Sequence, residues 1–198
     1  MKKTTTIAGL ILLALLFVNP ANAGVYVFNP EPADMYDLDH YKYYTWGLEW
    51  SAEGERVDDV FLSFEDIRNW WPYEENSLFI RMLDDAQLGL FEGEDLTPGI
   101  DDYFAGQGVL IDEWSDPVGG YATDGISLRY SLRELGLLDE FLAYSEDGTV
   151  AFAFDPDCHY FNSGVQVTVI TNTPEPATFL LFGVGLVGVG IARRRYSK

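Results

Sequence analysis

Two segments of this chain alternate apolar and polar residues with a period of two, a spacing that lets an extended strand bury one of its faces. In residues 165–171 the valines fall on the odd positions, while Gln166 and Thr168 fall on the even ones. In residues 126–132 the even positions are apolar and the odd ones polar. Half-buried strands of antiparallel sheets have this pattern. The chain is therefore constrained toward antiparallel β structure.

Further segments with a strand-like composition are separated by turn signals, and they cover residues 41–50, 57–64, 77–83, 108–114 and 149–154. Both faces of 77–83 are apolar, which predicts an interior strand. Helical spacing occurs in residues 135–144, and 92–108 is expected to be a long acidic loop. Many short strands, glycine turns and one short helix predict an all-β fold, an antiparallel β-sandwich for which a jelly roll is one topology.

The first 23 residues have the three parts of a secretory signal peptide. Lys2 and Lys3 precede an apolar run over residues 7–18, and Ala21-Asn22-Ala23 provides a small-residue cleavage site. As a helix the apolar run would measure about 18 Å, which is short of a hydrocarbon core of about 30 Å. We therefore expect signal peptidase and the general secretion machinery to export a mature chain that begins near Gly24.

The last 26 residues also combine three parts in a fixed order. Pro174-Glu175-Pro176 is followed by an uncharged, largely apolar run over 177–192, and Arg193-Arg194-Arg195 begins a short tail to residue 198. This arrangement resembles the PEP-CTERM sorting signal of secreted bacterial proteins. The prolines keep the segment around Glu175 extended. A helix over 177–192 would span about 24 Å, enough for a marginal membrane anchor.

The resemblance implies recognition by an exosortase, a membrane-embedded cysteine-dependent protease or transpeptidase, in a Gram-negative bacterium that makes exopolysaccharide. By the positive-inside rule the arginine tail stays cytoplasmic, so the chain is transiently anchored in the inner membrane. We expect a signal peptide over 1–23, an acidic sandwich over 24–172 and a sorting signal over 173–198. The alternative for the last segment is a plain C-terminal anchor.

Removal of both ends makes the exported part more acidic. Residues 24–176 hold all 32 acidic residues but only six of the 12 basic ones, a net charge of −26. This balance excludes a general nucleic-acid binder, because phosphate contacts need clustered cations. Cys158 is the only cysteine, so no intrachain disulfide can form, and we expect it to be a buried small hydrophobic residue; the alternative is a thiol that reacts or pairs with another molecule.

One turn places oxygen ligands close together in sequence. Asp155 and Asp157 are two residues apart, and Asn162 follows nearby. Carboxylate and amide oxygens are the ligands that Ca²⁺ prefers. The segment lacks the full spacing of an EF-hand, and Asp-Pro-Asp is common in plain turns. The two readings are a calcium site and a capped loop.

Aromatic residues gather at Trp70-Trp71-Pro72-Tyr73. Flat rings in a loop can stack on sugar faces, so Trp70, Trp71 and Tyr73 are candidate carbohydrate contacts. Packing in the sandwich core is the alternative for these residues. Trp46 and Trp50 lie four positions apart, hence on the same face of a strand, and we expect at least one of them to be in the core.

Signatures of common catalytic sites are missing from the sequence. His40 and His159 are the only histidines, and no G-x-S-x-G or H-E-x-x-H motif occurs. Cys158 and His159 are adjacent, so on a strand their side chains would diverge. We expect a non-enzymatic, secreted or cell-surface protein of the exopolysaccharide matrix that binds carbohydrate or calcium. Because carboxylates are abundant, the alternative of a secreted polysaccharide-active hydrolase stays open.

Overall fold

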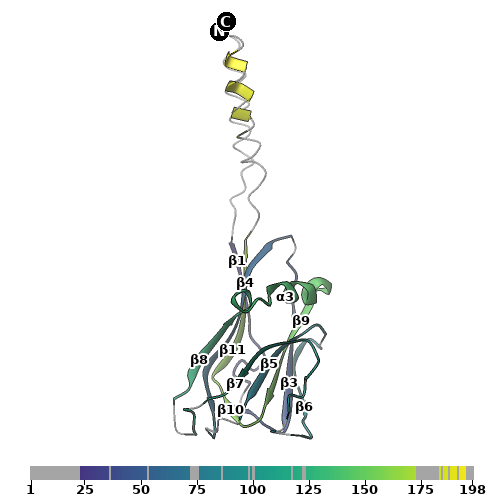
Figure 1. The fold of residues 1–198 in the computed structure, drawn as a ribbon, viewed down its shortest axis with the longest axis vertical. Helices are drawn as coiled ribbons and strands as arrows, with labels where there is room; N and C mark the ends of the chain where they lie inside the picture. Colours follow the sequence, from purple (N-terminus) through teal and green to yellow (C-terminus); the bar gives the residue numbers. More distant parts are fainter. Residues whose placement is uncertain are drawn as a thin grey trace. The chain divides into compact units, whose positions relative to one another are not determined.

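The computed structural model describes residues 23–35, 37–52, 54–71, 76–85, 87–97, 99, 101–116, 118–121, 124–172, 183, 185–186, 188–190 and 192–194. The chain divides into two units, one of which comprises Gly24–Glu53 and Val57–Thr171. The second unit comprises the rest of the chain. The first unit is a β-sandwich, which confirms the predicted fold class (Figure 1).

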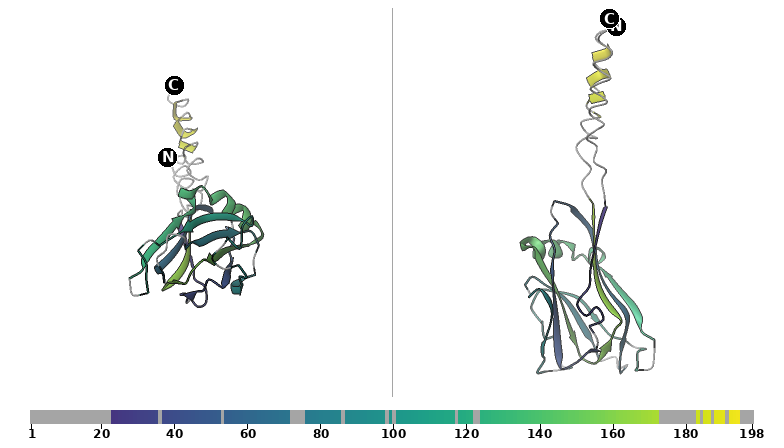
Figure 2. Two further views of the ribbon diagram at one scale, coloured as in Figure 1. Left: turned by 60° about the horizontal axis from the view of Figure 1, so that its bottom comes forward. Right: turned by 180° about the vertical axis from the view of Figure 1, so that it is seen from behind.

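The described strands form two sheets that face each other, as the two views of Figure 2 show. The six-stranded sheet runs in the order β1 (Ala23–Phe28), β11 (Gly164–Asn172), β4 (Arg56–Asn69), β10 (Tyr160–Phe161) and β2 (Asp37–Leu38), and β8 (Ile126–Ser131) pairs with β4. The five-stranded sheet runs in the order β6 (Gly89–Glu94), β3 (Lys42–Glu49), β9 (Thr149–Pro156), β5 (Leu78–Leu83) and β7 (Val109–Trp114). All strand pairs of this second sheet are antiparallel.

The core lies between the sheets and is rich in aromatic side chains. Phe64 of β4 and Phe154 of β9 are both fully buried, and their rings meet edge-on across the two layers at 5.4 Å. On β11, the odd positions predicted to face the core are buried, and the even positions are partly exposed. Trp46 and Trp50 are both in the core, with 2% and 6% of their surface exposed. The strand β5 lies inside its sheet, as expected.

The helical segment differs from the single helix expected over residues 135–144. The structure has α2 (Leu132–Leu135), α3 (Leu138–Tyr144) and a 3₁₀ turn, η1 (Ser145–Asp147). Ser131 caps α2 by accepting a hydrogen bond from the Glu134 N–H at 3.1 Å. Gly136 then adopts a left-handed conformation with φ of 75° and ends the helix.

Four strands were not predicted from the sequence: β1, β2, β6 and β10. The strands β2 and β10 have only two residues each, too few to show an alternation. The strand β6 is mostly exposed and includes Glu92–Glu94, so the expected loop over 92–108 begins later than predicted. The strand β8 was predicted, but its Ile126 is 50% exposed because this strand is buried only toward its C-terminal end.

The described positions from 183 to 194 are helical and exposed, and they include Arg193 and Arg194. Among the residues that the structure describes, no helix is long and apolar enough to cross a membrane. The signal peptide up to residue 22, the Pro174-Glu175-Pro176 motif, Arg195 and most of the helix expected over 177–192 lie outside the described residues.

Replacing Phe154 should test the packing between the layers. Phe154→Ala removes a fully buried ring and leaves a cavity against Phe64, so we expect a loss of about 3–5 kcal/mol in the free energy of unfolding, measured by urea denaturation. The matched control is Leu96→Ala, whose side chain is 83% exposed and should change stability by less than about 0.5 kcal/mol. Equal effects of the two substitutions would contradict this account of the core.

Candidate functional site

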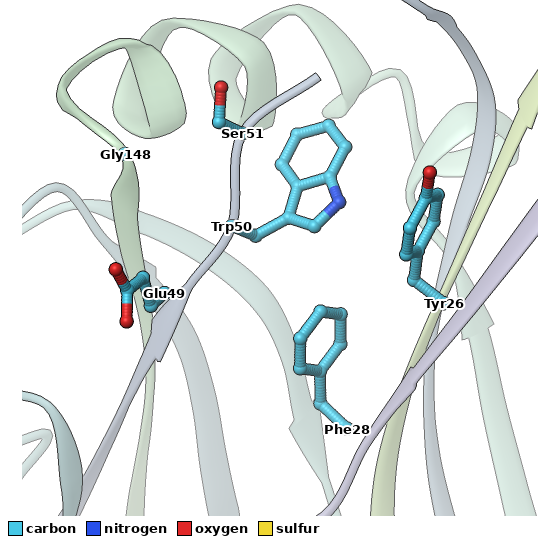
Figure 3. A pocket seen from close by; sticks show the side chains of 6 residues that line it. All are labelled: Tyr26, Phe28, Glu49, Trp50, Ser51 and Gly148. Carbon is cyan, nitrogen blue, oxygen red and sulfur yellow. The ribbon is translucent and has the colours of Figure 1, made fainter. Parts of the chain in front are cut away.

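A cavity of about 400 Å³ opens in the sandwich beside Trp50 (Figure 3). Its lining residues are Tyr26, Phe28, Glu49, Trp50, Ser51 and Gly148. Among the described residues the buried indole Nε1 of Trp50 has no hydrogen-bond partner. The cavity therefore offers aromatic surface, one free N–H donor and one carboxylate.

A second candidate region lies on the outer face of the six-stranded sheet, where β10 pairs with β2 and β4. Tyr160 of β10 is opposite Leu38 on one side and Asn69 on the other. All three side chains are fully buried. Because successive side chains of a strand point to opposite faces, the residues on either side of these three point outward.

The same register brings outward-facing residues from three strands together. Phe161 is opposite Asp37 on β2 and Arg68 on β4. The backbone carbonyl of His159 accepts a hydrogen bond from the Trp70 N–H at 2.8 Å, which continues the β4–β10 pairing by one residue. The outer face therefore carries Phe161 and His159 beside Arg68 and Trp70.

Four of these rings form what we call the outer aromatic patch: Trp70, Tyr121, His159 and Phe161. The Trp70 ring lies 5.1 Å from Tyr121, 5.3 Å from His159 and 5.6 Å from Phe161 between ring centroids. Trp70 is 39% exposed and Tyr121 is 68% exposed. The patch thus presents contiguous aromatic surface to the solvent.

Asp116 positions the loop that carries Tyr121. Its Oδ2 accepts a hydrogen bond from the Asn69 N–H at 3.1 Å, which ties the loop to the end of β4. Its Oδ1 accepts from the N–H groups of Val118 and Gly119 at 3.1 and 2.9 Å. A side chain at Gly119 would collide with the Asp116 carboxylate, so glycine is required for this close approach.

The positively charged side chain of Arg68 lies beside the patch. The guanidinium of Arg68 stands over the Phe161 ring at 5.5 Å and forms an ion pair with Asp66 through Nη1 and Oδ2 at 2.9 Å. Asp66 has a positive φ of 50° at the irregularity in the β4–β8 pairing. The carboxylate of Asp66 therefore holds a guanidinium, which can donate hydrogen bonds, at the edge of the aromatic surface.

The structure describes two of the three residues predicted to contact carbohydrate. Trp70 lies in the patch, Trp71 is 53% exposed and follows it, and Tyr73 lies outside the described residues. Tyr121 and Phe161 were missed by sequence reasoning, because they are distant in sequence from Trp70 and only the strand register and the Asp116 loop bring them close. The sequence offered no signal for Phe161, because its strand has only two residues.

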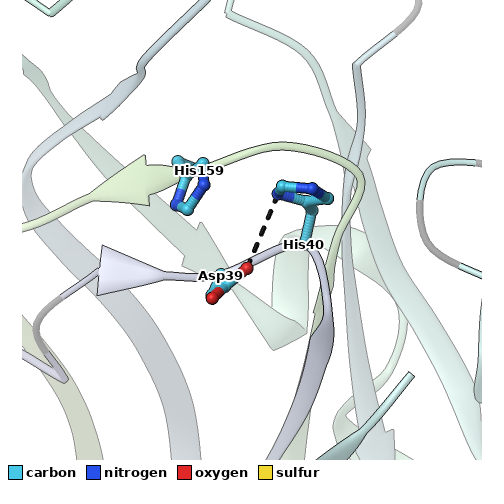
Figure 4. A group of neighbouring side chains, drawn as sticks. All are labelled: Asp39, His40 and His159. Atoms are coloured by element: carbon cyan, nitrogen blue, oxygen red, sulfur yellow. Dashed lines mark ion pairs between the residues drawn. The ribbon is translucent and has the colours of Figure 1, made fainter. Parts of the chain in front are cut away.

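His159, a member of this patch, also meets the other histidine of the chain, His40. The rings of His40 and His159 lie 4.8 Å apart between centroids, edge to face. Asp39, His40 and His159 are gathered around one space, with the Nδ1 of His40 3.5 Å from Oδ1 of Asp39 (Figure 4). The Nδ1 of His159 is hydrogen-bonded to Oδ2 of Asp37 at 2.6 Å. Burial raises the pKa of Asp37, and the hydrogen bond to His159 opposes that rise. We call these four residues the histidine cluster.

The residues predicted to bind calcium fall in both sheets. Asp155 lies on β9 of the five-stranded sheet and Asp157 follows that strand, whereas Asn162 follows β10 in the other sheet. The structure instead places other carboxylates near Asp155, those of Asp95 and Asp102. Asp95 is itself 5% exposed and was not predicted from the sequence.

Burial raises the pKa values of two carboxyl groups in this group. It raises the pKa of Asp155 to about 7, and the negative charges of Asp95, Asp157 and Asp102 add to the rise. A hydrogen bond from the Tyr103 N–H to Oδ2 of Asp155, at 2.7 Å, partly lowers this pKa again. Burial likewise raises the pKa of Asp157 to about 6. Asp155 therefore gains or loses its proton near neutral pH, whereas Asp157 does so at a lower pH.

The side chains of Cys158 and His159 diverge, although neither residue lies in a strand. Cys158 is half-buried and packs against the core, whereas His159 joins the outer aromatic patch. Burial raises the pKa of the Cys158 thiol. A raised thiol pKa lowers the fraction of thiolate and therefore the reactivity of the cysteine.

Comparison with known proteins finds a match at the C-terminal end. The model of the PEP-CTERM protein-sorting motif matches residues 172–195. No curated protein matches the chain. The match begins at Asn172, the last residue of β11, so the signal begins where this strand ends.

The raised pKa values of Asp155 and Asp157 predict that stability falls as the pH rises. In the folded state both groups hold their protons more tightly than in the unfolded chain, so their contribution is fully present below about pH 4 and is lost as the pH rises through 6 and 7. With a chelator present and ionic strength fixed, we expect urea denaturation to give a lower free energy of unfolding at pH 8 than at pH 5.

Asp155→Asn should reduce this dependence. The amide keeps an acceptor for the Tyr103 N–H but cannot ionise. Because Asp155 is only 1% exposed, we expect the substitution to remove a pH-dependent contribution to the free energy of unfolding on the order of a few kcal/mol. Asp85→Asn, at an exposed carboxylate, is the control and should keep the wild-type slope. If Asp155→Asn and wild type give parallel curves, burial of this carboxylate does not set the pH dependence.

Proposed function

Because the chain is a PEP-CTERM domain-containing protein, we propose that its β-sandwich is a non-enzymatic module that binds carbohydrate of the exopolysaccharide matrix. The motif implies export, processing by an exosortase and a surface or extracellular location. We further propose that the host is a Gram-negative bacterium and that the chain is anchored in its inner membrane until it is sorted. The sandwich is then the part that meets polysaccharide in the biofilm.

The outer aromatic patch is the observation that carries this proposal. Sugar rings present flat C–H faces that stack on aromatic rings, while their hydroxyl groups need hydrogen-bond partners at the rim. The exposed rings of Trp70 and Tyr121 supply the stacking surface. The Arg68 guanidinium, beside Phe161, supplies donors for hydroxyl oxygens. Aromatic surface with a polar rim is the composition that favours sugar binding.

In the cavity beside Trp50 and at the outer aromatic patch, the geometry favours binding over hydrolysis. Glycoside hydrolysis by the common mechanisms uses two carboxyl groups on either side of the scissile bond. Among its described lining residues the cavity beside Trp50 has one, Glu49. In the outer region Asp37 is engaged by His159, and Asp66 by Arg68. A secreted polysaccharide-active hydrolase is the alternative that the assay below separates.

We also propose that Ca²⁺ binds the carboxylates around Asp155. Asp155 and Asp95 are buried, and Asp157 lies close enough to Asp155 for their charges to interact. A dication would offset the free-energy cost of burying these charges and would reduce their mutual repulsion. Calcium suits this group because its ligands are oxygen atoms. In a part of the chain with a charge of −26, bound or bridging calcium would also reduce repulsion between copies in the matrix.

Binding of carbohydrate should depend on Trp70. We expect a glycan array to show binding by the purified chain, and Trp70→Ala to weaken it roughly tenfold, about 1.4 kcal/mol, in titration calorimetry. The control is Tyr103→Ala, which removes a ring that is 40% exposed and stacks on Tyr43 at 4.0 Å, away from the patch. A reducing-sugar assay runs in parallel, and release of sugar would support the hydrolase instead.

Calcium should raise the thermal midpoint. At a hundredfold excess over its dissociation constant a ligand adds about 2.7 kcal/mol to the stability of the folded state. We expect millimolar Ca²⁺ to raise the midpoint at pH 7.5, and Asp155→Asn to reduce the shift, while Asp85→Asn keeps it. An unchanged midpoint for the wild-type chain would remove calcium from the proposal.

A further inference from the structure

We propose that Asp39, His40 and His159 bind a divalent transition-metal ion, with Zn²⁺ as the first candidate, and that Asp37 is a positioning residue for His159. One ligand atom from each of the three lies within 4.8 Å of the other two. This site is distinct from the carboxylates around Asp155 and does not depend on carbohydrate binding. It unites the only two histidines of the chain.

The strand register brings the ligands together. The strands β2 and β10 are antiparallel, with Tyr160 opposite Leu38. Continued by one residue, this register sets His159 opposite Asp39, on the outer face. His40 follows Asp39 in the chain. Directly opposite residues on one face of a sheet have Cβ atoms about 4.5–5.5 Å apart, a spacing from which two side chains can reach one ion.

Asp37 leaves one nitrogen of His159 available for a metal. Oδ2 of Asp37 is 2.6 Å from Nδ1 of His159, so the carboxylate holds the proton on Nδ1 and leaves the lone pair on Nε2. A carboxylate that accepts from the second nitrogen of a histidine is the usual support of a zinc ligand, because it orients the ring and makes it more basic.

His40 supplies the second nitrogen. Its Nδ1 is buried and has no hydrogen-bond partner among the described residues, although Oδ1 of Asp39 lies 3.5 Å away. Oδ1 of Asp37, in the same cluster, is also buried and has no partner in the part of the chain that the structure describes. Buried polar atoms without partners are uncommon, because they have lost water and gained nothing in return. A cation among these atoms would satisfy the lone pair of His40 and the charge of Asp39.

The donor set selects the class of metal. Two imidazole nitrogens and one carboxylate suit Zn²⁺ and similar transition metals, whereas Ca²⁺ and Mg²⁺ prefer oxygen ligands alone. Tetrahedral Zn²⁺ with bonds of about 2.0–2.1 Å needs ligand atoms about 3.3 Å apart, so the side chains must close by about 1.5 Å at most. Rotation of partly exposed side chains allows this movement, and a water molecule would complete the four ligands.

The two imidazoles give a direct test on the unmodified chain. The purified full chain, labelled with ¹⁵N in its histidines, is titrated with Zn²⁺ at pH 7.5 with Ca²⁺ in excess to occupy sites made of carboxylates alone. We expect the Nε2 signal of His159 and the Nδ1 signal of His40 to shift at one equivalent, while Nδ1 of His159 keeps its proton. Unshifted histidine signals at one equivalent, or metal on Nδ1 of His159, would overturn the proposal.

Variants separate the ligands from the positioning residue. We expect His40→Gln and His159→Gln each to weaken Zn²⁺ binding at least tenfold in calorimetry, and Asp37→Asn to weaken it roughly 10–100-fold while the same two nitrogens still bind. Asp85→Asn is the control for loss of one negative charge and should bind as the wild type does. Wild-type affinity in the double histidine variant would show that the acidic surface alone binds the ion.

Discussion

The pairing of the two-residue strand β10 with β2 and β4 is the constraint on which the outer face depends. Tyr160 is fully buried, and its ring centroid lies 5.6 Å from that of Trp114 in the opposite sheet. Its hydroxyl donates a hydrogen bond to the Asn76 carbonyl at 2.8 Å. With this side chain fixed inward, His159 and Phe161 must face outward. A shift of the register by one residue would bury the histidine and expose the tyrosine. Both the aromatic patch and the histidine cluster therefore depend on one anchored residue.

In the exported part, the few cations contact individual carboxylates or aromatic rings, and most of the negative charge has no such partner. Arg81 pairs with Asp102 at 2.6 Å, Lys42 contacts Glu92 at 2.6 Å, and Arg129 lies 3.9 Å over the Phe61 ring. The acids that outnumber them repel one another, most strongly where they are buried. Cations from solution are the remaining source of compensation, and the two proposed metal sites differ because one offers oxygen atoms alone and the other also offers imidazole nitrogen.

The sequence predicted those parts of the fold that have a pattern of their own. The strands over 165–171 and 77–83 were recognised because several residues repeat an alternation or an apolar run. The helix expected over 135–144 begins only at Leu138, because Gly136 in a left-handed conformation ends the preceding helix at Leu135 and helical spacing does not reveal this break. The short strands β2 and β10 gave no signal, since their pairing is set by burial of Leu38 and Tyr160 in the finished sandwich.

For the candidate sites, sequence reasoning found Trp70 and Asp155 from local density of rings and acids. It could not find Tyr121, Phe161 or Asp95, because long-range pairing creates those contacts. The most direct test of the account is a two-dimensional NMR titration of the purified chain with the host's exopolysaccharide. We expect signals of Arg68, Trp70, Tyr121 and Phe161 to shift together. Shifts centred on the cavity at Trp50, or none on the outer face, would contradict the proposed binding surface.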